Sequence, residues 1–163
     1  TSSYDDNEVL EFGRCGYGLG HLQIDPFAYN SVGAGTWAYN FDLTLFEAGG
    51  TGIWRAGGIV NSSNADANNL TYNLYMAKGT YALTMMIRKF SLGANIEVQI
   101  DGTQVTLQDS YAATDTWNNR IQITGIAVSD SGLKAIKVAV NGRNGASGGW
   151  YANYQSMTFH RTA

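Results

Sequence analysis

The feature that most constrains the fold is the alternation of apolar and polar residues between Ala77 and Val105. After the turn signal Lys78-Gly79, apolar side chains take every second position, a period typical of a half-buried strand: Tyr81, Leu83, Met85 and Ile87. The period returns after a loop over residues 91–95, at Ile96, Val98 and Ile100. Asp101-Gly102 then suits a tight hairpin turn, because both central residues of such a turn need positive φ. We expect Val105 and Leu107 to continue the inward face beyond this turn.

The same period recurs in short segments along the rest of the chain. These segments cover residues 9–12, 21–25, 36–41, 53–60, 70–76, 121–128, 136–140 and 150–161. Gly125 interrupts one of them in a way that suggests a bulge, and the methionines at 76, 85, 86 and 157 are interpreted as core gap-fillers. Residues 61–69 and 141–149 are expected to be exposed, flexible loops. About nine or ten short strands with regular turns predict an all-β protein, a two-sheet antiparallel β-sandwich of the jelly-roll type.

Length and composition indicate one domain. A chain of 163 residues can bury a sizeable core, and its 20 glycines and low charged fraction of 14% suit a fold with many turns. Residues 1–8 (TSSYDDNE) are polar, and we expect a flexible N-terminal arm there, with a single β-sandwich domain over residues 9–163. The start carries no secretory signal, and no apolar run is long enough to span a membrane. We therefore expect a soluble chain, without membrane insertion, that is not exported or has already been processed.

The charge distribution bears on possible partners. The formal net charge is -3 and the basic residues are not clustered, which argues against nucleic-acid binding. Residues 1–76 hold eight acidic and two basic side chains, whereas residues 77–163 hold five acidic and eight basic ones. The two halves can therefore attract each other or a neighbouring copy, or the charges are ordinary surface charges that happen to sort this way. Cys15 is the only cysteine and is interpreted as a small buried side chain.

The chain offers little material for catalysis, metal binding or a cofactor. It has two histidines, His21 and His160, and no sequence context of a nucleophilic triad or a carboxylate pair, so we expect no enzyme and assign no catalytic residue. A carboxylate pair that meets only in space remains the alternative. His21 and Asp25 have no third ligand, so no metal site is predicted. The glycine-rich residues 13–20 lack the Gly-Lys-Ser/Thr of a phosphate loop, and no cofactor is predicted.

One predicted strand carries three aromatic residues on a single face. These are Trp37, Tyr39 and Phe41. Such a row is either part of the core or a platform on which sugars stack, and the core interpretation is favoured because each ring buries a large area.

From Leu70 onward, the order of features resembles the β-sandwich domains of bacteriophage virion proteins, and more distantly those of carbohydrate-binding modules. The matching segments are 70–74 (LTYNL), 77–81 (AKGTY), 96–102 (IEVQIDG), 123–126 (ITGI), 131–134 (SGLK) and 141–147 (NGRNGAS). Residues 16–20 (GYGLG) and 35–37 (GTW) are also similar to such phage domains. The likeness spans most of the chain, although its motifs are mostly strand and turn signals.

The resemblance implies a non-enzymatic virion structural protein on the particle surface, made in the host cytoplasm. It implies a homotrimer whose partners are capsid or fibre proteins, and both a capsid decoration protein and part of a tail or head fibre remain open. A trimer of this kind should bury an apolar patch between subunits.

The alternative is a carbohydrate-binding module or a receptor-binding domain that recognises a cell-surface glycan. For this alternative, the likeness implies a rim of aromatic side chains, with four stacking candidates: Tyr111, Trp117, Trp150 and Tyr151. The acidic residues near them form no recognisable calcium loop. A sugar-binding monomer should leave Trp117 and Trp150 open to solvent.

Overall fold

The computed structural model describes residues 20–40 and 58–163, which form eleven β-strands. They are β1 (His21–Ile24), β2 (Ser31–Ala34), β3 (Trp37–Asn40), β4 (Gly58–Asn61), β5 (Asn69–Met76), β6 (Gly79–Lys89), β7 (Asn95–Ile100), β8 (Thr103–Asp109), β9 (Thr116–Val128), β10 (Gly132–Val140) and β11 (Asn153–Arg161). Within these two ranges there is no helix. The predicted arm at 1–8, the strand at 9–12, Cys15, Phe41 and the segment 53–57 lie outside the described residues.

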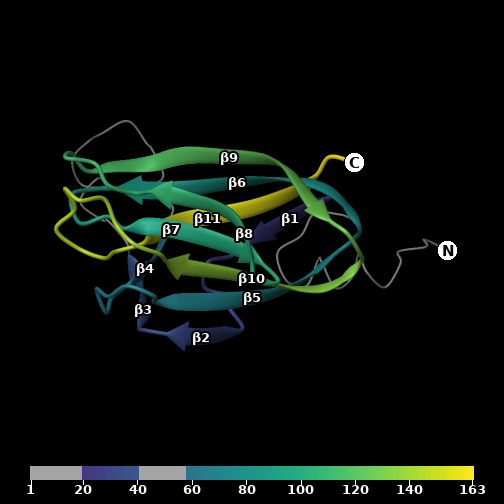
Figure 1. Cartoon of the computed structure of the whole chain (residues 1–163), viewed down its shortest axis with the longest axis horizontal. Coiled ribbons are helices and arrows are strands. Elements are labelled where there is room, and N and C mark those ends of the chain that lie inside the picture. Colours follow the sequence, from purple (N-terminus) through teal and green to yellow (C-terminus); the bar gives the residue numbers. More distant parts are fainter. Residues whose placement is uncertain (1–19, 41–57) are drawn as a thin grey trace, which may run out of the picture.

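The strands form two antiparallel sheets. The six-stranded sheet has the order β3-β4-β11-β6-β9, with β1 also paired to β11, and the five-stranded sheet has the order β2-β5-β10-β7-β8. Figure 1 shows the long strands running side by side along the longest axis of the molecule. The predicted two-sheet antiparallel β-sandwich is therefore confirmed. No helix among the described residues is long and apolar enough to cross a membrane.

The core lies between the sheets and contains the alternate residues that the sequence pattern selects. The four inward residues of β6 are at most 1% exposed, and the inward residues of the five-stranded sheet that face them include Leu70, Tyr72, Ile136 and Val138. Burying each such aliphatic side chain stabilises the fold by about 1.5–3 kcal/mol. Met76, Met85 and Met157 are fully buried as predicted, whereas Met86 is half-buried because it lies on the opposite face of β6.

A tyrosine pair joins the two sheets inside this core. The Tyr72 hydroxyl donates to the Pro26 carbonyl oxygen at 2.7 Å and also contacts the Tyr154 hydroxyl. Burial raises the pKa of Tyr154 well above its ordinary value of 10.0, and the neighbouring Tyr72 adds to this effect. Trp37 packs edge-on against Tyr154, with ring centres 6.4 Å apart, so its ring contributes to the core.

Bulges in β8 and β9 alter the register of these two edge strands. Gly125 has φ +74°, and Thr124 and Gly125 together oppose Ala82 of β6, which confirms the predicted bulge in β9. In β8, Val98 pairs with Thr106 while Gln99 pairs with Gln104, so Val105 is an extra residue. A shift of one residue turns every following side chain to the other face. The prediction that Leu107 faces inward is therefore wrong: Leu107 is 41% exposed, and Thr106 is 5% exposed in its place.

One end of the sandwich, here called the loop end, gathers residues 35–36, 62–68, 90–94, 110–115 and 141–152, on the left of Figure 1. The expectation of two loose loops there is only partly met. Asn61 and Asn68 are buried rather than exposed, and Asn61 closes β4. The second loop is fixed by hydrogen bonds, among them Gly142 N–H to Asp66 Oδ1 (3.0 Å) and Gly148 N–H to the Ser91 carbonyl oxygen (3.0 Å).

Candidate functional site

The loop end brings the four predicted stacking residues to one end of the sandwich. Tyr111 follows β8, Trp117 is the second residue of β9, and Trp150 and Tyr151 directly precede β11. All four side chains are half-buried. They fall into two groups, because the ring of Tyr151 lies against Phe90 whereas that of Trp150 lies against Arg143.

The first group, here called the Phe90 cluster, consists of Arg88, Phe90, Tyr111, Trp117 and Tyr151. The Arg88 guanidinium carbon lies 4.3 Å from the ring centre of Phe90 and 4.6 Å from that of Trp117. The rings of Phe90 and Tyr151 are 6.3 Å apart. One cation therefore joins two aromatic side chains from different strands, each contact contributing about 0.5–1 kcal/mol where it is exposed.

An ion pair holds Arg88 in this position. Its Nε donates to Asp115 Oδ1 at 2.9 Å, and its Nη2 donates to Asp115 Oδ2 at 2.6 Å. This two-point contact fixes the plane of the guanidinium group. Asp115 comes from the β8–β9 loop, so the same contact ties that loop to β6 beside Trp117.

The backbone places Tyr111 in the same cluster. Tyr111 forms an isolated parallel bridge with Phe90, and the Phe90 N–H donates to the Ser110 carbonyl oxygen at 3.0 Å. The Asp109 carboxylate accepts from the Tyr111 N–H at 2.8 Å. Residues 109–112 therefore lie along Phe90, and the Tyr111 side chain is carried by a fixed piece of chain.

The second group is built around Trp150. Its ring lies beneath Arg143, whose guanidinium carbon is 4.6 Å from the ring centre. The Trp150 N–H donates to Asn64 Oδ1 at 2.7 Å, and the Trp150 carbonyl oxygen accepts from Asn61 Nδ2 at 2.6 Å. Side chains of the 61–68 segment thus hold the Trp150 backbone from both sides.

The two tryptophans differ from what a simple sugar platform requires. Trp117 and Trp150 are half-buried rather than open, and each has an arginine over its ring. Each indole therefore presents only part of its surface to a ligand. Arginine and asparagine donors lie beside the rings, which suits a ligand with both apolar faces and hydroxyl groups.

Sequence analysis missed Arg88, Phe90 and Arg143. A signal for the first two exists, because Arg88 and Phe90 are two residues apart at the end of an alternating strand and so lie on one face. Their partners Trp117 and Tyr151 are distant in sequence, and alternation alone does not pair them. In the described parts of the chain, no group of three or more His, Cys, Asp or Glu residues is placed to hold a metal ion.

No protein-family profile and no curated protein sequence matches this chain. Solved structures match its fold. A Paenibacillus xanthan lyase is 19% identical, with a TM-score of 0.63, and the match covers 82% of this chain but only 12% of the lyase. The CBM36-1 domain of a multidomain xylanase from the hindgut metagenome of Trinervitermes trinervoides is 16% identical, with a TM-score of 0.61, covering 88% of this chain and 98% of the domain.

A third match is the CsCBM6-3 module of Clostridium stercorarium, solved in complex with cellobiose. It is 18% identical, with a TM-score of 0.57, and the match covers 91% of this chain and 97% of the module. None of these three structures is a virion protein, and nothing in them supports the predicted virion origin, homotrimer or capsid partners. Two of these three structures are carbohydrate-binding modules, and this chain shares their β-sandwich fold.

Proposed function

We propose that this chain is a non-catalytic carbohydrate-binding module that holds a glycan at the Phe90 cluster. The observation that carries the proposal is the gathering of Phe90, Trp117 and Tyr151 around one arginine at the loop end. The fold shared with carbohydrate-binding modules supports it. Tyr111, which forms a parallel bridge with Phe90, is a further stacking residue of this site.

The chemistry of the cluster fits a sugar ring. A pyranose has a face of C–H groups and an edge of hydroxyl groups, and an aromatic side chain offers an apolar surface to the first. Hydroxyl groups at the edge of the ring need donors and acceptors, and Arg88 and Asp115 lie beside the aromatic side chains. The ion pair between them keeps these groups in place before the ligand arrives, which reduces the entropy lost on binding.

The test begins with the unmodified chain on an array of plant, fungal and bacterial glycans. The glycan that binds best is then used to compare Trp117→Ala and Tyr151→Ala with the matched control Trp150→Ala, at the same end of the sandwich but in the other group. We expect each Phe90-cluster variant to weaken retention by at least about tenfold, as truncation of a central aromatic contact does. Glycan retention by the control should stay within about threefold of that of the unmodified chain, because Trp150 lies outside the Phe90 cluster and its loss removes no central contact with the glycan.

Two results would contradict the proposal. One is binding that survives in both cluster variants while their near-ultraviolet circular dichroism shows an intact fold. The other is the absence of retention on every glycan of the array.

A further inference from the structure

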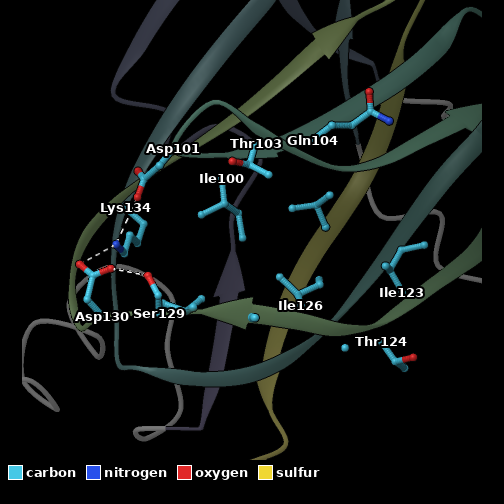
Figure 2. A pocket seen from close by; sticks show the side chains of 14 residues that line it. Ile100, Asp101, Thr103, Gln104, Ile123, Thr124, Ile126, Ser129, Asp130 and Lys134 are labelled. Atoms are coloured by element: carbon cyan, nitrogen blue, oxygen red, sulfur yellow. Dashed lines mark hydrogen bonds and ion pairs between the residues drawn. The ribbon is translucent and has the colours of Figure 1, made fainter.

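A hollow lies between the two sheets, away from the Phe90 cluster. It has a volume of about 480 Å³, within the range of about 300–1,000 Å³ that is usual for small-molecule sites. One wall comes from β7 and β8 of the five-stranded sheet and the other from β9 of the six-stranded sheet. Figure 2 shows Ile100 and Ile126 pointing into the space from these opposite walls.

The hollow is open because the two edge strands beside it, β8 and β9, each carry a bulge. The extra residue of β8, Val105, and the two bulged residues of β9, Thr124 and Gly125, all line it. A bulge bends its strand and increases the local twist, and bulges are frequent beside binding sites. Two bulges on facing strands part the sheets at one place, so that inward residues of the sandwich become pocket walls.

The walls are aliphatic and the rim is polar. The apolar residues are Ile100, Val105, Ile123, Ile126 and Val128, and no lining residue is aromatic. Hydroxyl and amide groups of Thr103, Gln104 and Thr124 belong to the polar part. Stacking on an aromatic ring is therefore not available here, and the walls suit a slender aliphatic group.

One end of the hollow carries charge. The Lys134 ammonium, on a residue that is only 8% exposed, lies 3.2 Å from Asp101 Oδ2 and 3.2 Å from Asp130 Oδ2, as Figure 2 shows. Hydrogen bonds from Ser129 and Lys134 lower the pKa of Asp130, and those to Asp130 and Asp101 raise the pKa of Lys134. Two aspartates and one lysine meet here, so the group has a formal net charge of one negative.

We propose that this pocket binds an organic ammonium ion with a short aliphatic body. The body would lie between Ile100 and Ile126, and the ammonium head would approach the carboxylates, of which Asp130 is 71% and Asp101 47% exposed at the side chain. A carboxylate head would meet a net negative charge, and the one cation present is already paired with two aspartates. This site is separate from the Phe90 cluster and does not depend on the proposed glycan binding.

The test uses n-hexylammonium, with hexanoate and 1-hexanol as probes of equal length but different charge, titrated into the ¹⁵N-labelled chain. The expected result is a saturable shift of the amide signals of residues 123–128. We expect n-hexylammonium to bind about two- to fivefold more tightly than either other probe, the effect of one partly exposed charge contact. Asp130→Asn should weaken the binding of n-hexylammonium by a similar factor.

Two tryptophan variants locate the site. Ile123→Trp, on the β9 wall of the pocket, fills it and should abolish the shifts, whereas Gln122→Trp, on the same strand but outside the pocket lining, should leave them unchanged. The proposal is overturned if hexanoate or 1-hexanol binds as tightly as n-hexylammonium. It is also overturned if none of the three produces a saturable shift in the unmodified chain, or if Ile123→Trp retains binding.

Discussion

Among single residues, Asn61 links the 61–68 segment to the chain that carries the aromatic rings. It is fully buried, its Nδ2 donates to the Trp150 carbonyl oxygen, and its Oδ1 accepts from the Ala152 N–H. Although Asn61 stands in an Asn-X-Ser sequence, both ends of its amide are engaged inside the protein. The polar side chain that the sequence suggested for a solvent loop is therefore a structural element.

Asn61→Ala should lower the free energy of unfolding by about 2–3 kcal/mol, because two buried backbone groups lose their partners. Urea unfolding followed by tryptophan fluorescence measures this directly. Thr114→Ala, at an exposed position of the same end, is the control and should change the free energy of unfolding by less than about 0.5 kcal/mol. Equal stabilities for the two variants would refute the role given to Asn61.

Asp130 gives a prediction about pH. The hydroxyl of Ser129 and the ammonium of Lys134 hold the pKa of Asp130 below its ordinary value of 3.8. Because the folded-state pKa is the lower one, this carboxylate stabilises the fold above pH 3.8 and loses that effect as the pH falls through the folded-state value. Asp130→Asn should therefore be less stable than the unmodified chain at neutral pH, and the gap should close in acid. Urea unfolding at a series of pH values tests this, and a gap that is independent of pH would disprove it.

At the scale of the elements, two glycines play different parts. Gly125 forms the β9 bulge with φ +74°, and a methyl group there would meet no other atom within 4 Å. A Cβ on Gly93 would instead collide with the Ser110 carbonyl group, which accepts a hydrogen bond from Phe90 N–H. The first position needs glycine for its backbone angle, and the second needs it for space.

Gly125→Ala should lower the free energy of unfolding by about 1–2 kcal/mol, because a residue with a side chain is strained in the left-handed conformation. Gly93→Ala should cost more and should also weaken glycan binding, since the backbone under Phe90 must move. Thermal unfolding and glycan retention measured on both variants separate the two effects. Intact glycan retention in Gly93→Ala would show that the Ser110–Phe90 contact does not position the site.

Alternation predicts the faces of strands well, and contacts between distant strands poorly. The inward residues of β5, β6, β7 and β10 follow directly from the period of two, because each strand has one face against the core. The prediction for Leu107 is wrong because the bulge at Val105 contains no glycine or proline that would indicate it in the sequence. The Phe90 cluster is predicted only in part, for another reason. Its members come from the end of β6 and the residue after it, from the β8–β9 loop, from β9 and from the chain before β11, which only the assembled fold brings together.

For the whole molecule, the open question raised by the sequence is whether copies associate. A virion surface protein would form a trimer that buries an apolar patch, whereas a sugar-binding module works as a single copy. The bulges in β8 and β9 also make one edge strand of each sheet a poor template for pairing with another chain. Light scattering should therefore give the mass of a monomer, 17.6 kDa. A stable trimer would contradict this and would favour the virion interpretation.

The central claim is that the loop end of this sandwich binds a glycan at the Phe90 cluster. Nuclear magnetic resonance titration of the ¹⁵N-labelled chain, with the oligosaccharide that the array selects, tests it most directly. We predict that the largest shifts fall on the indole N–H of Trp117 and on the backbone of residues 88–93, 110–117 and 149–151. Shifts confined to the pocket between β8 and β9, to the Trp150 and Arg143 side chains, or to the outer face of either sheet would contradict the claim.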